Sequence, residues 1–261
     1  MRSETAVGGD LWADVSGTGP DVVLLHSLAL NSRVWDPIAE RYASVFRAIR
    51  PDFPGHGESG YDGRALTVFD LADGIVGVLD RLGVGQADVI GVSLGGSVAM
   101  ALGLRHPERL RRLVLADCSA DYGPQRVSYW AERAHQAVTV PRAEQFARTK
   151  ERWFSGGFLR TRPDVIARFE AMFVDCDSAA HAETCRALGA LNLLDELPAI
   201  AAQTLVAVGG DDPGTPVSMA EAIAARIPGA RLDIVPGARH MALFEREDVW
   251  DAILDHLRSA P

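Results

Sequence analysis

The chain has 261 residues, and its 26 lysine and arginine side chains against 35 aspartate and glutamate side chains give a formal net charge of −9 at pH 7. This acidic balance argues against nucleic acid or an anionic membrane as a partner. The first residues lack the features of a signal peptide, and no apolar run reaches the ~18 residues that span a bilayer, so we expect a cytoplasmic protein. Cys118, Cys176 and Cys185 have neither the count nor the spacing of a disulfide framework or a metal site.

Strands and helices alternate in the first part of the chain. Short β-branched and aliphatic runs bounded by Gly or Pro predict strands at residues 10–15, 22–26, 45–50, 89–90 and 110–116. Helical spacing of apolar residues follows two cap signals, one at Asn31 or Ser32 and one at Thr67 with Asp70 three positions on. This alternation is typical of a mostly parallel, doubly wound α/β sheet.

The alternation is interrupted between residues 118 and 200. There the sequence predicts helices at residues 126–138, 141–153, 163–174 and 178–190, separated by Pro141, Gly156-Gly157, Pro163 and Asp177. It then resumes with strands at residues 204–210 and 230–235 and helices at residues 216–227 and 249–257. We therefore predict a core of residues 1–117 and 201–261 and a helical cap of residues 118–200 over the carboxyl edge of the sheet.

The stretch GVSLG at residues 91–95 lies between a predicted strand and a predicted helix, with Ser93 at its centre. Because Gly91 and Gly95 lack side chains, neighbouring backbone can approach and leave the Ser93 hydroxyl exposed in a strained turn. The helix that follows directs its N–H groups and the positive end of its dipole at the same point. This context predicts a nucleophilic serine beside an oxyanion site.

A serine nucleophile needs a base and an acid that orients the base. His240 lies in a Gly/Pro loop after a late strand, as this chain order requires. Asp212 is our first choice for the acid, because DPGTP places it at the turn before a helix, and Asp211 and Asp117 remain alternatives. The two oxyanion donors are predicted to be the backbone N–H groups of Leu28 and Leu94.

With these motifs the chain resembles the α/β-hydrolases, and among them the 3-oxoadipate enol-lactonases. The segments that carry the resemblance are HSLALNSRVWDP, GVSLGG, ERWFSGGF and the acid region TLVAVGGDDPGTP. The chain departs from the family at Ala29-Leu30, where a glycine is usual, and in HMALFERED. The resemblance implies an α/β-hydrolase fold and the opening of an enol-lactone in aromatic catabolism, without a cofactor.

Two other kinds of function stay open at this point. The same three residues could serve a general carboxylesterase, or a perhydrolase or acyltransferase that needs no cofactor, because only the acceptor differs. A non-catalytic binding protein of this fold would have no need of the intact Ser93, Asp212 and His240. The sequence leaves the oligomeric state open and predicts a small-molecule substrate as the partner.

The cap carries an excess of positive charge. Between residues 142 and 162, six basic side chains face only two acidic ones, Glu144 and Glu151. Two interpretations stay open: these side chains are the solvated faces of cap helices, which we favour, or one or two of them reach into the site and bind a substrate carboxylate while aromatic side chains bury its apolar part. The candidates for this substrate site are Arg152 with Trp153 and Phe154, and Arg133 with Trp130.

Overall fold

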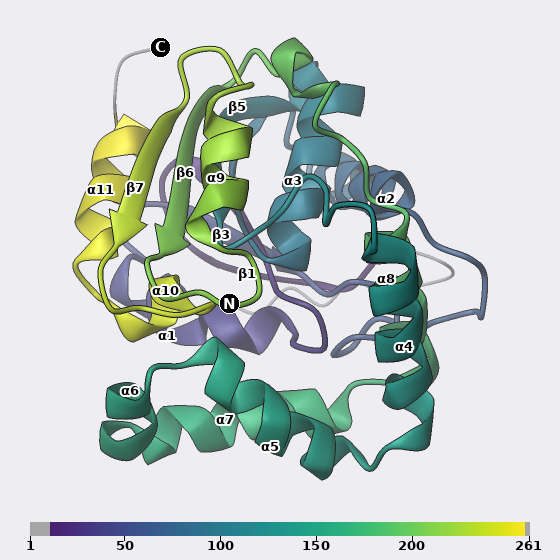
Figure 1. Cartoon of the computed structure of the whole chain (residues 1–261). Helices are drawn as coiled ribbons and strands as arrows, with labels where there is room; N and C mark the ends of the chain where they lie inside the picture. The colour runs from purple at the N-terminus through teal and green to yellow at the C-terminus, as the bar shows by residue number, and fades with distance from the viewer. Residues whose placement is uncertain (1–10, 259–261) are drawn as a thin grey trace.

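The computed structural model describes residues 11–258 and contains one seven-stranded sheet (Figure 1). Its strands are β1 (Ala13–Gly17), β2 (Asp21–Leu25), β3 (Arg47–Pro51), β4 (Ala87–Val92), β5 (Leu110–Ala116), β6 (Gln203–Gly209) and β7 (Arg231–Val235). The order across the sheet is β1-β3-β2-β4-β5-β6-β7. Only β1 runs antiparallel to its neighbour, so the predicted mostly parallel sheet is confirmed.

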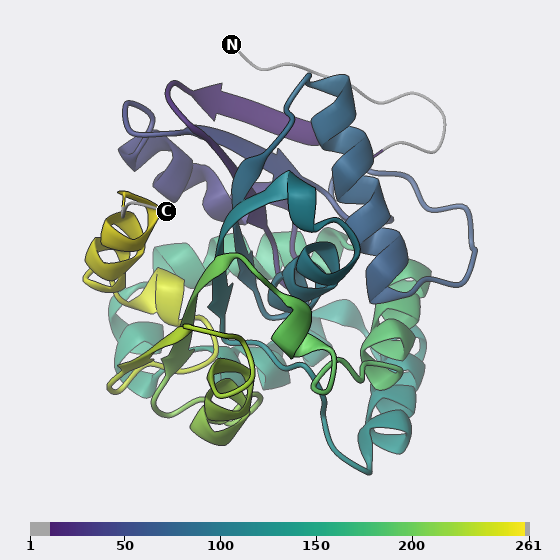
Figure 2. The same ribbon diagram turned by 90° about the horizontal axis from the view of Figure 1, so that it is seen from above.

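Helices cover both faces of this sheet. Those outside the cap segment are α1 (Asp36–Arg41), α2 (Val68–Arg81), α3 (Leu94–Arg105), α9 (Val217–Ala224), α10 (Ala242–Glu245) and α11 (Val249–Arg258). Helices α1 and α11 lie on one face, and α2, α3 and α9 lie on the other (Figure 2). Because both faces are covered, β2 and β4 are almost entirely buried, which explains their aliphatic sequences.

Of the two predicted helix N-caps, one begins the expected α-helix and the other begins a 3-10 helix. Thr67 and Asp70 form the expected capping box at the start of α2. Asn31 accepts a hydrogen bond from the Arg33 N–H, but it begins a 3-10 helix (Ser32–Trp35) that precedes α1. The first strand, predicted at residues 10–15, is Ala13–Gly17, the range over which it pairs with β3. Residue 10 lies outside the described residues.

The segment between β5 and β6 contains helices, loops and one isolated antiparallel bridge between Asp121 and Asn192. The helices are α4 (Arg126–Thr139), α5 (Arg142–Trp153), α6 (Gly156–Thr161), α7 (Pro163–Asp175) and α8 (Ser178–Gly189), together with a 3-10 turn at Leu197–Ala199. Helices α4 to α7 lie beyond the carboxyl ends of the strands (Figure 1). The pair Gly156-Gly157, predicted to separate helices, instead begins α6, because the Ser155 side chain caps it by accepting the Phe158 N–H. The domain boundaries at residues 118 and 200 stay a prediction.

Candidate active site

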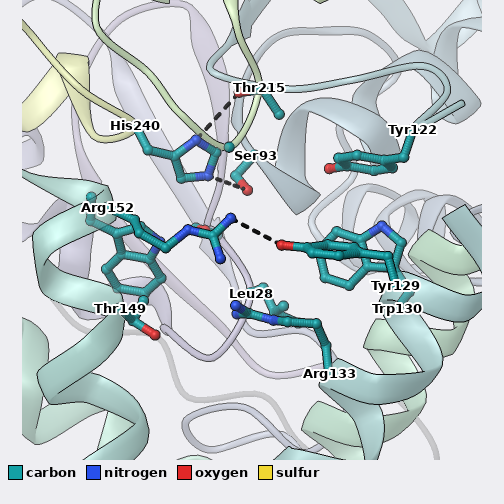
Figure 3. A pocket seen from close by; sticks show the side chains of 13 residues that line it. Leu28, Ser93, Tyr122, Tyr129, Trp130, Arg133, Thr149, Arg152, Thr215 and His240 are labelled. Carbon is teal, nitrogen blue, oxygen red and sulfur yellow. Dashed lines mark hydrogen bonds between the residues drawn. The ribbon is translucent and has the colours of Figure 1, made fainter. Parts of the chain in front are cut away.

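Ser93 occupies the sharp turn between β4 and α3. Its backbone has φ 56° and ψ −116°, a region that a residue with a side chain rarely adopts. The turn is possible because a Cβ at Gly91 would lie 2.2 Å from the Gly95 carbonyl oxygen, and one at Gly95 would lie 2.3 Å from the Leu25 carbonyl oxygen. The strained turn places the Ser93 hydroxyl at the carboxyl edge of the sheet, in a cavity between the sheet and the cap helices (Figure 3).

His240 lies in the loop between β7 and α10, directly beside Ser93 (Figure 3). The Ser93 hydroxyl donates to His240 Nε2 at 2.9 Å, and His240 Nδ1 donates to Asp212 Oδ2 at 2.8 Å. Side chains from three separate loops therefore form one continuous hydrogen-bonded chain. Such a chain can move a proton from the hydroxyl to the imidazole.

The loop around Asp212 holds its carboxylate in place. Oδ1 accepts the N–H groups of Gly214 at 2.7 Å and Thr215 at 3.1 Å, while Oδ2 accepts the Thr215 hydroxyl at 2.6 Å. Burial alone would raise the pKa of Asp212, but His240 and these donors outweigh it, so the pKa lies below its usual value. For His240, burial opposes protonation, but the Asp212 charge and hydrogen bond outweigh burial and raise its pKa.

The two alternative acids lie in other environments. Asp211 is exposed, and its backbone N–H donates to the Ala238 carbonyl. Asp117 is fully buried at the end of β5, where its carboxylate accepts the N–H groups of Gly209 at 2.8 Å and Ala242 at 3.0 Å. Burial raises the pKa of Asp117 to about 8. Asp117 thus ties together the two loops that carry Asp212 and His240, while Asp212 itself contacts the imidazole.

Two buried histidines fix the loop after β2, which contains Leu28. His56 Nε2 accepts the Ala29 N–H at 3.2 Å, and its Nδ1 donates to the Pro54 carbonyl. His26 accepts the Phe53 N–H and donates to the Ser27 carbonyl in the same manner. Burial lowers the pKa of both histidines, to about 4 for His56, so both stay neutral and keep their acceptor nitrogens.

These contacts stabilise a strained loop. Ala29 has φ 60°, a conformation that favours the glycine usual at this position. Leu28 lines the cavity, and Leu94 is the first residue of α3, directly after Ser93. Their backbone N–H groups stay the predicted oxyanion donors.

The cavity around Ser93 is open to solvent, and its empty space, with the open mouth included, is about 530 Å³. Its lining residues are Ser27, Leu28, Ser93, Tyr122, Tyr129, Trp130, Arg133, Thr149, Arg152, Trp153, Gly214, Thr215 and His240. Four of the five predicted cap residues are therefore part of the cavity wall. Tyr129 was missed by sequence reasoning, although it lies four residues before Arg133 and so shares its helix face. The other lining residues that were not predicted are Ser27, Tyr122, Thr149, Gly214 and Thr215.

Phe154 is the exception among the predicted cap residues. Helix α5 ends at Trp153, and Phe154 follows with an extended backbone, so Phe154 does not continue the helical spacing. It is fully buried, and its ring centroid lies 5.3 Å from that of Phe158 and 4.9 Å from that of Phe169. The expectation that Phe154 lines the substrate site was wrong, because the side chain belongs to the core of the cap.

Two guanidinium groups from opposite cap helices enter the cavity (Figure 3). Arg152, on α5, donates to the Tyr129 hydroxyl at 2.9 Å, and the Arg133 guanidinium, on α4, lies 5.9 Å from the centroid of the Trp130 ring. Among residues 11–258, neither arginine forms an ion pair with a carboxylate. The site therefore offers two positive charges to a ligand.

Other basic side chains of the cap are occupied elsewhere. Arg148 pairs with Glu144 and Arg162 pairs with Asp164, both at the exposed surface. Arg142 is not part of the cavity wall and contacts His181 and the Phe173 carbonyl. Only Arg152, of the six basic residues between 142 and 162, lines the cavity.

Within residues 11–258, no three or more His, Cys, Asp or Glu side chains are grouped so that they could hold a metal ion. In the same range, no helix has both the length and the apolar character needed to cross a membrane.

The fold agrees with the comparisons with known proteins. The model of the α/β hydrolase fold family matches residues 20–247, and the chain belongs to this family. One similar structure is a hydrolase from Pseudomonas aeruginosa, with a TM-score of 0.91, 32% identity and coverage of 99% of this chain and 98% of that one. Another is the enol-lactonase from Burkholderia xenovorans, with a TM-score of 0.92, 29% identity and coverage of 98% and 100%.

Similar sequences carry two kinds of name. 3-oxoadipate enol-lactonase 1 of Acinetobacter baylyi is 26% identical over 243 residues, which cover 92% of this chain and 90% of the relative. The pimeloyl-[acyl-carrier protein] methyl ester esterase of Nitrosomonas europaea is 30% identical over 264 residues, which cover 94% and 98%. The resemblance to α/β-hydrolases and to the enol-lactonases among them is confirmed.

Proposed function

We propose that this chain is a serine hydrolase that opens small lactones or esters, with Ser93 as nucleophile, His240 as base and Asp212 as the orienting acid. The observation that carries the proposal is the hydrogen-bonded chain Ser93–His240–Asp212, with links of 2.9 and 2.8 Å, at the inner end of a cavity. The membership of the chain in the α/β hydrolase family supports it.

The reaction follows from this geometry. His240 accepts the hydroxyl proton as Ser93 attacks the ester carbonyl, and ionised Asp212 stabilises the imidazolium that forms. The backbone N–H groups of Leu28 and Leu94 donate to the oxyanion of the tetrahedral intermediate. His240 then protonates the leaving oxygen, which in a lactone stays attached to the acyl chain, and water activated by the same imidazole releases the acid.

Within this class we propose a substrate that carries a free carboxylate, such as 3-oxoadipate enol-lactone in aromatic catabolism. Arg133 and Arg152 face the cavity without acidic partners among the described residues, in a chain whose formal net charge is −9. Trp130, Trp153 and Leu28 supply apolar walls for the rest of a small molecule. The named enol-lactonases among the similar proteins support this choice.

A second candidate is hydrolysis of a carboxylic ester of another acid. It is favoured by the methyl ester esterase relative, whose 30% identity extends over nearly both chains. The same three residues serve both reactions, so the two candidates differ only in what the cap side of the cavity accepts.

The proposed function is tested by the reaction of the protein with a serine-directed fluorophosphonate and by turnover of a panel of lactones and short esters. We expect labelling at Ser93 and the highest kcat/KM on a lactone with a free carboxylate. Turnover of no lactone or ester, together with no labelling of Ser93, would contradict the proposal.

A further inference from the structure

The Ser27 hydroxyl is buried at the cavity wall without a hydrogen-bond partner. The residue is 1% exposed, lines the cavity and directly precedes Leu28. Its Oγ contacts no donor or acceptor among the side chains and backbone groups of residues 11–258. Two other buried serines differ from it, because Ser97 donates to the Ser119 carbonyl at 2.8 Å and Ser59 donates to the Asp52 carbonyl at 2.8 Å.

Hydrogen bonds hold the backbone beside this hydroxyl in place. The Ser27 carbonyl accepts a hydrogen bond from His26 Nδ1 at 2.8 Å and a second from the Leu30 N–H at 3.2 Å. Both bonds hold the peptide group between Ser27 and Leu28, next to the predicted oxyanion donor. A buried hydroxyl without a partner destabilises the free protein, and alanine would avoid this cost at the same position.

We infer that the Ser27 hydroxyl is a substrate-binding group, which hydrogen-bonds an oxygen atom of the bound ester or lactone beside the oxyanion donor at Leu28. The inference rests on the proposed function. The bound substrate would supply the hydrogen-bond partner that the Ser27 hydroxyl lacks in the free protein.

The opposite wall of the cavity has a second polar atom of this kind. Trp130 is 7% exposed and lines the cavity from α4, and its indole Nε1 has no hydrogen-bond partner among residues 11–258. An indole N–H can only donate. This donor is a second buried polar atom, on the cap side, that the fold leaves without a partner.

Ser27→Ala tests the inference, with Ser97→Ala as the matched control at a buried serine whose hydroxyl has a partner. We expect Ser27→Ala to lower kcat/KM for the best lactone about tenfold, or ~1.4 kcal/mol in transition-state stabilisation. The melting temperature should stay equal or rise, because an unsatisfied group is removed. Ser97→Ala should lower the melting temperature and leave kcat/KM within about twofold.

Inhibition by an alkylboronic acid, which forms a tetrahedral adduct with a serine nucleophile, supplies a readout besides turnover. We expect Ser27→Ala to weaken this inhibition by a similar factor. If Ser27→Ala leaves kcat/KM and boronic acid inhibition unchanged, or if it only lowers the melting temperature, the hydroxyl has no role in binding. That result leaves the proposed function intact, whereas failure of the wild type to turn over any lactone or ester would contradict the proposed function itself.

Discussion

His240 Nε2 lies 2.9 Å from the Ser93 hydroxyl oxygen, although 147 residues separate the two in the chain. The contact forms because β4 and β7 run parallel in one sheet, so the loops at their carboxyl ends meet at the same edge. The cap helices then enclose this contact in a cavity (Figure 3). A hydroxyl, an imidazole and two guanidinium groups thus come together at one place.

Ser93→Ala should abolish hydrolysis while the protein stays folded. The hydroxyl is the proposed attacking group, and its loss removes little packing, so we expect kcat to fall by ~10⁴-fold or more with an unchanged melting temperature. His240→Ala should lose a comparable amount, because nucleophile and base act as a unit. Steady-state kinetics and thermal unfolding of both variants check this. If Ser93→Ala turns over substrate as fast as the wild type, Ser93 is not the nucleophile.

Asp212→Asn should damage turnover far more than Asp211→Asn or Asp117→Asn. An amide cannot stabilise the imidazolium and favours the wrong tautomer of His240, so we expect kcat to fall ~10⁴-fold. Asp211→Asn serves as the exposed control. Kinetics on the three variants decide the matter, and if Asp117→Asn is the most impaired, the acid lies at the end of β5.

The value of kcat/KM should fall when His240 becomes protonated. Only the neutral imidazole can accept the Ser93 proton, so kcat/KM should rise with pH through the pKa of His240, which Asp212 holds above its ordinary 6.5 despite the opposing effect of burial. Removal of that charge in Asp212→Asn should move the rise to lower pH, although the rate itself is smaller. A pH profile whose midpoint is the same in both proteins would show that Asp212 does not act on His240.

Sequence reasoning located Ser93, Asp212 and His240 because each follows a strand, and the ends of parallel strands meet whatever the detailed packing. It could not place Phe154, since helix α5 ends just before this residue and the packing of its ring against Phe158 and Phe169 depends on contacts in three dimensions. It also missed Ser27 and Tyr129. A serine beside a predicted oxyanion loop carries no signal that its hydroxyl lacks a partner, because that depends on contacts in three dimensions.

Acid should destabilise the protein through His56. This histidine is buried and neutral, with its pKa lowered to about 4 chiefly by burial, so its contribution to folding is present above the unfolded value of 6.5 and is lost as the pH falls toward 4. By this linkage the free energy of unfolding should be ~2 kcal/mol lower at pH 5 than at pH 7 from His56 alone. Denaturant titrations at the two pH values measure it.

His56→Gln is the matched variant for this measurement. Its amide oxygen can accept the Ala29 N–H, but the side chain does not titrate. We therefore expect the difference in unfolding free energy between pH 7 and pH 5 to shrink by ~2 kcal/mol in the variant. An undiminished difference would assign the acid sensitivity to other groups.

Arg152→Ala and Arg133→Ala should each discriminate an anionic lactone from its neutral methyl ester. Hydrogen bonds to charged groups contribute ~1.5–3 kcal/mol, so we expect kcat/KM to fall roughly 10- to 150-fold on the anion and to change little on the ester. Arg148→Ala is the control, because this arginine pairs with Glu144 at the exposed surface of the same helix as Arg152. If neither cavity variant distinguishes the two substrates, or if the wild type prefers the ester, the carboxylate site does not exist and the broader esterase function replaces it.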